Sequence, residues 1–358
     1  MESNSNGGKT SQSLSWVEKY RPTTLSDVVA HEEIVSTLRL LMESDSMPHL
    51  LFYGPPGTGK TSTVKACAYQ LYGKDRVRGN VLEMNASDDR GIDVVRNQIR
   101  EFSSTTSIFS SLGATREAKE GTRRTVPFKL VVLDEADQMS HDAQAALRRV
   151  IEKYTKNVRF CVLCNHINKI IPAIQSRCTR FRFAPVRKSA MIPRLQTIAE
   201  QEQVTYTPAG LTAAFRLSQG DLRRCLNMMQ AASLSFNTIT ETSMYRVTGN
   251  PTREEVSGMV SSMLSSGFCE SYASVLASTT LSGVSVMDLV REMHPIVMSM
   301  DLPLDCKCFL LKVLSDLEYY AAGGAREACG LGGLVGTFQL VKESVTQRKP
   351  LSSMLRIA

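Results

Sequence analysis

The sequence feature that most constrains this chain is an octapeptide, GPPGTGKT, at residues 54–61. It matches the pattern GxxxxGK(S/T), follows an apolar run at 50–53, and opens a stretch at 60–72 with a helical pattern. In that setting the glycines let backbone amides approach phosphate groups closely, and the helix N-terminus faces the anion. The match therefore predicts a nucleoside triphosphate site in a phosphate-binding loop (P-loop, residues 54–61) between a buried strand and a helix.

Two side chains of the P-loop have chemical roles that follow from their positions in the pattern. Lys60 is expected to reach the β- and γ-phosphates, and the Thr61 hydroxyl is expected to coordinate Mg²⁺. The predicted cofactors are ATP and Mg²⁺, and Lys60 is also a predicted catalytic residue. The predicted nucleotide-binding residues of this segment are Tyr53, Gly54, Pro55, Pro56, Gly57, Thr58, Gly59, Lys60, Thr61 and Ser62.

An acidic turn, LDEAD, ends the apolar run at 129–137. Asp134 is placed to hold Mg²⁺ beside Thr61, directly or through water. Glu135 can accept a proton from water and direct that water at the γ-phosphorus. A protein that only binds ATP could lack this glutamate, so its presence favours hydrolysis with Glu135 as a catalytic residue.

Two asparagines end predicted strands. Asn165 ends the run at 159–165, where its amide could orient the attacking water or contact the γ-phosphate. Asn85 ends the run at 81–85 and could act as a switch by hydrogen bonding to Glu135. Asparagine is also common in loops, so neither residue decides between the two interpretations by itself.

The order of these patterns predicts a doubly wound α/β domain with a parallel sheet. Short apolar runs alternate with helical stretches, as expected when helices cover both faces of the sheet. After Pro185 the pattern is helical, with a break at 249–251. The predicted strands are 50–53, 81–85, 129–137, 159–165 and 181–183, and the predicted domains are a disordered tail at 1–13, an ATPase domain at 14–187, a helical lid at 188–248 and a helical domain at 249–358.

Composition narrows the class of protein. A net charge of +7 is compatible with a polyanionic partner without requiring one. No window approaches the roughly 20 apolar residues of a membrane span, and the polar tail does not resemble a signal peptide. We therefore expect an intracellular protein with no membrane partner. Its nine cysteines are expected to be reduced thiols, with Cys161 and Cys164 in the core because no second ligand pair accompanies them.

Several segments, taken in order, resemble one family. WVEKYRP at 16–22, the P-loop, NASDDRGID at 85–93, the acidic turn, SRC at 176–178 and GDLRR at 220–224 occur together in the small subunits of replication factor C. That family contains AAA+ ATPases of the eukaryotic sliding-clamp loader. The resemblance covers residues 14–250 well and the remainder loosely.

The resemblance implies an architecture, a function and partners. The expected fold is an AAA+ P-loop NTPase domain with a parallel sheet, a small helical lid and an all-α C-terminal collar. The expected function is ATP-dependent loading of the sliding clamp onto primer–template DNA, in replication and repair, as one subunit of a heteropentamer. The implied partners are the other clamp-loader subunits, the sliding clamp (proliferating cell nuclear antigen) and primer–template DNA. A nuclear location follows from that role.

The resemblance also implies roles for single residues. Val17 and Arg21 would line the adenine pocket, Asn165 would be sensor 1, and Arg223 would be sensor 2, carried by the lid. Arg177 of the SRC segment would be a catalytic arginine finger that reaches the ATP of a neighbouring subunit. A guanidinium suits that role because it can offset the charge that spreads over the phosphoryl oxygens.

Basic residues on two helices are candidates for contact with DNA. Arg90, Arg96 and Arg100 recur near one helical face, and Arg148 and Arg149 lie on the helix after the acidic turn. Such residues could follow a phosphate backbone without reading bases, although a solvated helix face would have the same pattern. With the resemblance taken into account, the predicted DNA contacts are Arg90, Arg96 and Arg149.

One segment departs from the family, and two other functions stay open. Residues 110–127 form a polar, charged insertion before the strand at 129, expected to be a flexible surface element or a basic element that contacts nucleic acid or a partner. The alternatives are a different AAA+ enzyme, such as a branch-migration motor, and a structural subunit that binds ATP without appreciable turnover.

Overall fold

The computed structural model describes residues 15–44, 47–86, 92–104 and 128–347. The predicted insertion at 110–127, the tail at 1–13 and Arg90 lie outside these ranges. The chain divides into two compact units, and the boundary between them along the chain lies between Ile239 and Thr240. The predicted three-domain division, with its lid at 188–248, stays a prediction, and in this two-way division the helix at 241–248 belongs to the second unit.

Among the described residues of the first unit, five parallel strands form one sheet in the order β2-β3-β4-β1-β5. This confirms the predicted parallel α/β fold. The strands are β1 (Leu50–Tyr53), β2 (Val81–Asn85), β3 (Lys129–Asp134), β4 (Val158–Cys164) and β5 (Thr179–Arg182).

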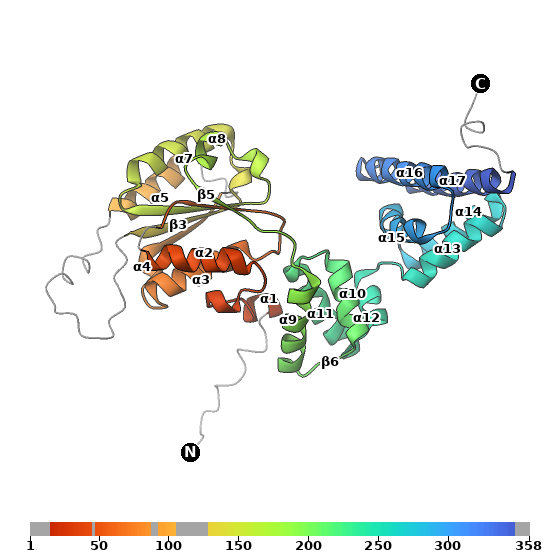
Figure 1. The fold of residues 1–358 in the computed structure, drawn as a ribbon, viewed down its shortest axis with the longest axis horizontal. Coiled ribbons are helices and arrows are strands. Elements are labelled where there is room, and N and C mark those ends of the chain that lie inside the picture. The colour runs from red at the N-terminus through yellow and green to blue at the C-terminus, as the bar shows by residue number, and fades with distance from the viewer. Residues whose placement is uncertain (1–14, 45–46, 87–91, 105–127, 348–358) are drawn as a thin grey trace, which may run out of the picture. The chain divides into compact units, whose positions relative to one another are not determined.

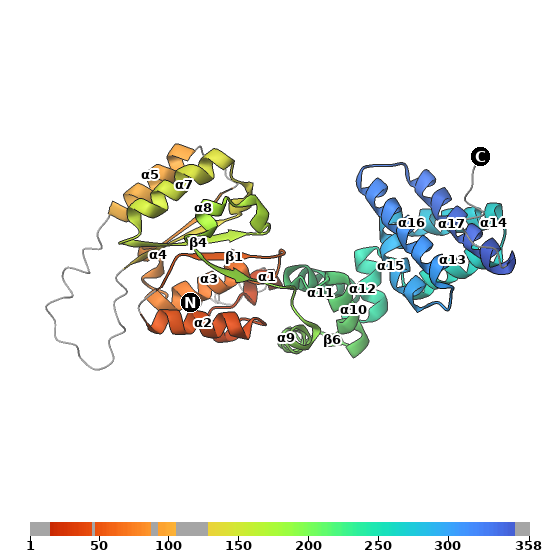
Figure 2. The ribbon, with the colours of Figure 1, turned by 45° about the horizontal axis from the view of Figure 1, so that its top comes forward.

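Alternate side chains of each central strand enter two separate hydrophobic clusters. In β1, Leu50 and Phe52 join one cluster and Leu51 joins the other, and all three are buried. Helices α2 (Glu32–Glu43), α3 (Lys60–Tyr72) and α4 (Val77–Asn80) lie on one face of the sheet, and α5 (Ile92–Ser104), α7 (His141–Tyr154) and α8 (Pro172–Gln175) lie on the other (Figure 1, Figure 2). Burial on both faces is why these strands are continuously apolar.

The parallel arrangement brings the carboxyl ends of the strands to one edge of the sheet. β1 ends at Tyr53 directly before the P-loop, β3 ends at Asp134 of the acidic turn, and β4 ends one residue before Asn165. Short helical turns η2 (Ala136–Gln138) and η3 (Ile167–Lys169) follow β3 and β4. Ligands of doubly wound sheets bind at this edge.

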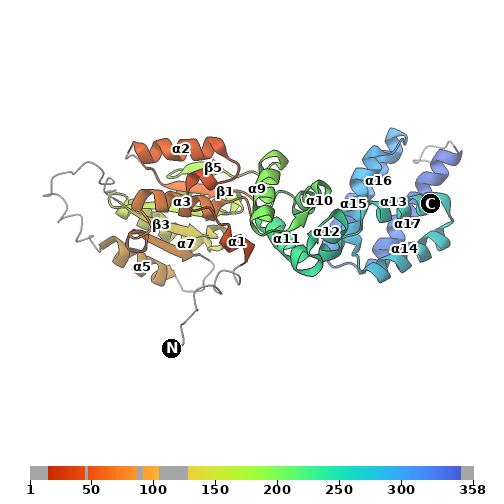
Figure 3. The same ribbon diagram turned by 90° about the horizontal axis from the view of Figure 1, so that it is seen from below.

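Outside the sheet, the elements assigned to the described residues of the first unit are helices, apart from one short strand pair. The lid helices are α9 (Lys188–Gln201), α10 (Pro208–Ser218) and α11 (Leu222–Phe236), and α1 (Trp16–Lys19) lies between them and the sheet, followed by η1 (Leu25–Asp27) (Figure 3). The sequence predicted only helix after Pro185, but β6 (Thr205–Tyr206) pairs with β7 (Thr238–Ile239) in parallel. A pair of two-residue strands is too short to leave a periodic signal.

Every assigned element of the described part of the second unit is a helix, as the sequence predicts. Its core is built of methionine, valine and leucine side chains together with Phe338, which is fully buried. The helices are α12 (Glu241–Thr248), α13 (Arg253–Ser265), α14 (Phe268–Ser282), α15 (Val286–Ser299), α16 (Leu304–Ala322) and α17 (Glu327–Gln347). Within the described ranges no single helix could cross a membrane by length and composition, and the pair α14 and α15, which could together, is bent by 116°.

Candidate nucleotide-binding site

The P-loop depends on glycine where the backbone has a positive φ and a close neighbour. At Gly57 φ is +67°, and a Cβ atom there would lie 1.6 Å from Asp221 Oδ1 of the lid. Gly59 is also left-handed, with φ +98°, but a Cβ atom at this position would meet no atom within 4 Å. The loop is thus packed against the lid at one glycine and open at the other.

Lys60, the first residue of α3, is buried at the centre of the loop. Its Nζ donates to the carbonyl oxygens of Gly54 at 2.7 Å and Pro55 at 2.8 Å, and to Asn165 Oδ1 at 2.9 Å. Burial lowers the pKa of Lys60 from its ordinary value, against the opposing effect of nearby acidic groups. Because all three of these acceptors are uncharged, phosphate oxygens would be stronger partners for the ammonium group.

Thr61 and Asp134 form the adjoining pair. The Thr61 hydroxyl donates to Asp134 Oδ2 at 2.9 Å, and the backbone N–H of Glu135 donates to Asp134 Oδ1, also at 2.9 Å. A hydroxyl beside a carboxylate is the set of hard oxygen ligands that Mg²⁺ takes when it also binds phosphates. These two residues therefore fit the metal role predicted for them.

Glu135 lies in the same pocket, held in an uncommon backbone conformation. Its φ is +55°, which is costly for a residue other than glycine and is typical of functional sites. Its Oε2 accepts a hydrogen bond from Gln138 Nε2 at 3.2 Å. Asn85 is the register partner of Asp134 at the ends of β2 and β3, one residue from Glu135. The predicted hydrogen bond between Asn85 and Glu135 stays a prediction.

Asn165 is positioned by a residue to which the sequence had given no role. The buried carboxylate of Asp137 accepts the backbone N–H of Asn165 and that of His166, each at 3.3 Å. Asp137 thereby ties the turn after β3 to the end of β4. Asp137 could be seen in the sequence as the last acidic residue of LDEAD. The spacing of the motif does not show which backbone N–H groups its carboxylate would accept.

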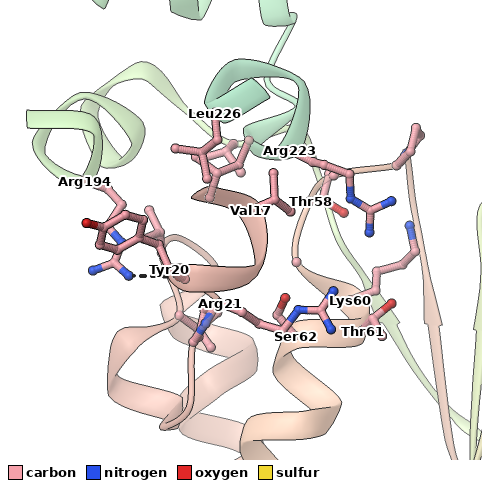
Figure 4. A pocket seen from close by; sticks show the side chains of 18 of the residues that line it. Val17, Tyr20, Arg21, Thr58, Lys60, Thr61, Ser62, Arg194, Arg223 and Leu226 are labelled. Atoms are coloured by element: carbon pink, nitrogen blue, oxygen red, sulfur yellow. Dashed lines mark hydrogen bonds between the residues drawn. The ribbon is translucent and has the colours of Figure 1, made fainter. Parts of the chain in front are cut away.

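The other side of the pocket combines apolar side chains with two arginines, and most of it comes from the α1 region and the lid. Val17 and Arg21 line it, although their role toward adenine stays a prediction, and Tyr20 and Arg194 lie beside them, with Arg194 Nη2 donating to the Tyr20 carbonyl oxygen at 3.2 Å (Figure 4). An apolar wall below a polyphosphate cradle suits a nucleotide base. The lining residues that the sequence did not predict are Tyr20, Pro22, Val28, Val29, Val186, Arg194, Ile198, Leu222 and Leu226.

The lid contacts the P-loop directly. The backbone N–H of Leu222 donates to the Gly57 carbonyl oxygen at 3.1 Å, at the first turn of α11, and Asp221 caps that helix by accepting from Arg224 N at 2.9 Å. From the same turn, the Arg223 side chain extends toward Lys60 (Figure 4). Its positive charge adds to burial in lowering the pKa of Lys60.

Comparison with known proteins places this geometry in a family. Residues 50–186 match the model of the ATPase family associated with various cellular activities (AAA), and residues 251–337 match that of the replication factor C C-terminal domain. The chain is 46% identical over 335 residues to replication factor C subunit 5 of Homo sapiens, covering 93% of this chain and 94% of the relative. The chain belongs to the replication factor C subunit family. It is accordingly an ATPase subunit with clamp-loader function in DNA replication.

Replication factor C subunits of other eukaryotes are similar to this chain over nearly its whole length. Identity is 47% over 337 residues with the probable subunit 5 of Dictyostelium discoideum, covering 94% of this chain and 93% of the relative. It is 41% over 326 residues with subunit 3 of Schizosaccharomyces pombe, covering 91% of each chain. The Holliday junction branch migration motor RuvB of Thermotoga maritima has a TM-score of 0.50 and 13% identity, over 72% of this chain and 85% of its own. At that identity the likeness shows the AAA+ fold alone.

Not every predicted residue of this replication factor C subunit lies at the pocket. Tyr53, Gly54 and Pro55 are not among its lining residues. The carbonyl oxygens of Gly54 and Pro55 instead accept hydrogen bonds from Lys60 Nζ. Arg177 lies two residues after α8 and is exposed, as is Arg149 on α7. Arg96 belongs to α5, and its side chain, like Arg90, lies outside the described residues. The DNA contacts and the finger role stay predictions.

Proposed function

We propose that this subunit binds ATP with Mg²⁺ in the pocket between the sheet and the lid, and hydrolyses it in a ring of related subunits. One observation carries the proposal: the segments that follow three parallel strands meet around one pocket, with Lys60 and Thr61 after β1, Asp134 and Glu135 at the end of β3, and Asn165 after β4. Glu135 and Asn165 argue against a purely structural nucleotide, because neither is needed for binding alone.

Each of these side chains has a distinct task. Lys60 exchanges its carbonyl partners for phosphate oxygens, and Thr61 with Asp134 holds Mg²⁺. The metal, when bound, supplies positive charge that offsets the charge developing on the phosphoryl group. Glu135 takes the proton of the attacking water on its carboxylate, and Asn165 orients that water. Asn85 would restrain Glu135 until hydrolysis is required.

The lid makes binding a conformational event. Because α11 is hydrogen bonded to the P-loop through Leu222 and Gly57, a change in the loop on binding phosphate passes directly to Arg223 and the lid helices. ATP then favours one arrangement of the subunit over another by differential affinity. In the ring, that preference would open the sliding clamp and place it on primer–template DNA in the nucleus.

The surfaces assigned to partners follow from the family. Arg90, Arg96 and Arg149 would contact the DNA backbone without reading bases, so that binding weakens with salt. The helical second unit would form the collar, and it carries exposed apolar side chains such as Leu281 and Tyr319. The clamp, proliferating cell nuclear antigen, would bind the ring through surfaces on several subunits.

Substitution of Lys60 tests the nucleotide site. Lys60→Ala removes the buried ammonium, so we expect ATP binding by this subunit to be lost in equilibrium binding with a fluorescent ATP analogue. Asp142→Asn, a change on the exposed surface of α7, is the control and should bind normally. Unaltered affinity of the Lys60→Ala protein would refute the assignment of the pocket.

Substitution of Arg177 tests the role in trans. In the reconstituted complex, Arg177→Ala should leave the ATP affinity of its own subunit unchanged and slow single-turnover hydrolysis at the adjoining site by about 10³-fold or more. If only ATP bound to the same chain were affected, Arg177 would act in cis and the finger assignment would be wrong.

A further inference from the structure

Three charged side chains gather on the face of the sheet that carries α7 and α8. Arg177 Nη2 lies 2.5 Å from Glu152 Oε1, and Arg148 Nε lies 3.0 Å from the same oxygen. The side chains of Arg148, Glu152 and Arg177 are 46%, 40% and 35% exposed. Glu152 is thus one carboxylate shared by two arginines at the surface.

The guanidinium of Arg177 has a second partner on α8, the helix that ends two residues before it. Its Nη1 donates to the Ala173 carbonyl oxygen at 2.7 Å, one turn back along the chain. The carboxylate and the carbonyl together fix where the guanidinium points. Hydrogen bonds and charge from Arg148 and then from Arg177 keep the pKa of Glu152 below its ordinary value, so the carboxylate is ionised at neutral pH.

The two arginines differ in how they are tied to Glu152. Arg148 stands four residues before Glu152 on α7, so the helix itself keeps this pair together. Arg177 lies just after α8 and reaches Glu152 on α7 only through its flexible side chain. If Arg177 leaves, the carboxylate keeps Arg148 as a partner and no charge is left unpaired.

Resting on the proposed role of Arg177 in trans, we propose that Glu152 is a positioning residue that holds Arg177 within its own subunit until a neighbour presents the phosphates of its nucleotide. The exposed ion pair is weak because solvent screens it, so a close polyphosphate, with several negative charges, outcompetes a single carboxylate. Arg148 then takes over the carboxylate. Hydrolysis at the neighbouring site is in this way tied to closure of the interface.

The two partners of Arg177 predict effects of opposite sign. With Glu152→Gln the guanidinium loses its charged partner and keeps only the Ala173 carbonyl and a neutral amide, so the basal hydrolysis at the adjoining site, without clamp or DNA, should rise roughly two- to fivefold. With Arg148→Gln, Glu152 has only Arg177 as a partner and holds it more firmly, so stimulated hydrolysis should fall by a similar factor. A merely structural cluster would lose activity with both changes.

The test uses the complete clamp-loader complex reconstituted with each variant, checked for assembly by size-exclusion chromatography. Single-turnover ATP hydrolysis is measured without partners and with clamp and primed DNA. Asp142→Asn removes the same charge from the same helix and is the matched control, expected to behave as the unaltered complex. The Glu152→Gln effect should disappear in the double variant Glu152→Gln/Arg177→Ala, because it acts through Arg177.

The outcomes separate this inference from the proposed function. If Arg177→Ala slows the adjoining site but Glu152→Gln leaves basal hydrolysis unchanged or lower, the holding role of Glu152 is wrong and the trans finger stands. If Arg177→Ala has no effect on the adjoining site, the trans finger itself fails. A rise in basal rate that persists without Arg177 also overturns the inference.

Discussion

A buried basic side chain lies near each end of strand β1, with Lys60 on the helix that follows the P-loop and His49 directly before the strand, and the two differ in their hydrogen-bond partners. At the carboxyl end, Lys60 donates to two P-loop carbonyls and to Asn165, partners that a phosphate can replace. At the amino end, His49 is buried and is bonded to protein groups that no ligand can replace, the Phe160 N–H and the Thr155 hydroxyl. Burial lowers the pKa of both groups.

The contacts of His49 define its state. Its Nδ1 accepts the backbone N–H of Phe160 at 3.1 Å, so this nitrogen carries no proton, and its Nε2 lies 3.4 Å from Thr155 Oγ1. The imidazole is therefore neutral and joins β1 to β4 and to the end of α7. Burial, assisted by the charge of Arg159, lowers the pKa of His49 to about 4.

The comparison teaches that a perturbed pKa does not by itself mark a functional group. Both ends of β1 show the effect, but only the carboxyl end opens into a pocket with other polar side chains around it. The amino end is part of the core and contributes stability. Substitutions at the two ends should therefore change different quantities, ligand affinity at one end and unfolding at the other.

Apart from the loss of Lys60 itself, the largest effect is expected at Gly57, where the P-loop meets the lid. Gly57→Ala places a Cβ atom 1.6 Å from Asp221 Oδ1 in a backbone conformation with positive φ. Strain and overpacking together disfavour the packed arrangement of P-loop and lid by roughly 4 kcal/mol; because the free subunit can relieve this cost by letting the lid move away and ATP binding needs the packed arrangement, ATP Kd should rise by up to about a thousandfold. Titration of the purified subunit with a fluorescent ATP analogue measures the change.

A double-mutant cycle separates the two costs at Gly57. Asp221→Ser shortens the side chain but keeps a residue that can cap α11, so it should recover part of the loss caused by Gly57→Ala. Gly59→Ala is the matched control, since it is also strained but meets no atom within 4 Å. Recovery of Gly59→Ala by Asp221→Ser, or none for Gly57→Ala, would contradict direct contact between lid and loop.

The next effect is on stability and comes from His49. Its pKa is lowered from 6.5 to about 4, so the unfolded chain binds the proton more readily than the folded one. Neutral His49 contributes roughly 3 kcal/mol to the free energy of unfolding. This contribution is complete above pH 6.5 and is lost as pH falls toward about 4. Urea unfolding followed by fluorescence of Trp16, the single tryptophan, measures this loss.

His49→Asn isolates the histidine from the carboxylates that titrate in the same range. The asparagine Oδ1 can accept the Phe160 N–H as Nδ1 does, and it binds no proton. The variant should be less stable than the unaltered chain at neutral pH and should lose less stability on acidification. Equal losses in the two proteins would mean that His49 does not titrate with the folding equilibrium.

The sequence predicted the first unit closely because motif and periodicity agree there. The predicted runs at 50–53 and 81–85 are strands with those same bounds, and the helix predicted at 60–72 is α3. Lys60, Thr61 and Asp134 could be placed together because carboxyl ends of parallel strands must meet at one edge. The motif context was therefore enough to place Thr61 next to Asp134, to which its hydroxyl is hydrogen bonded.

What the sequence missed depends on contacts between segments far apart in the chain. Arg194 and Leu226 line the pocket only because lid helices fold back against α1, and no spacing within α9 or α11 announces this. Asp137 was visible, but its bond to the backbone of Asn165 depends on how β3 and β4 end side by side. Glu152 carried no motif at all. These residues become informative only once tertiary structure sets their neighbours.

The smallest effect is expected where the lid is bonded to α1 and to Tyr20, which lines the same pocket. Glu202 Oε1, just after α9, accepts from Lys19 Nζ at 2.6 Å and from Tyr20 Oη at 2.5 Å. Burial alone would raise the pKa of Glu202, but the two bonds outweigh it and lower the pKa. Glu202→Gln keeps an acceptor and removes the charge, so ATP Kd should rise only about twofold.

Glu200→Gln makes the same charge change two residues away and is the matched control. Glu200 accepts from Tyr206 Oη at 3.1 Å, a contact within the lid that does not reach α1. If the tie between lid and α1 helps to shape the adenine side of the pocket, only Glu202→Gln should weaken ATP, and high salt should abolish the difference because it screens the same pair. Equal effects from both variants would mean that the total charge of the lid sets the ATP affinity. The hydrogen bonds between Glu202 and α1 would then have no separate part in shaping the apolar wall of the pocket.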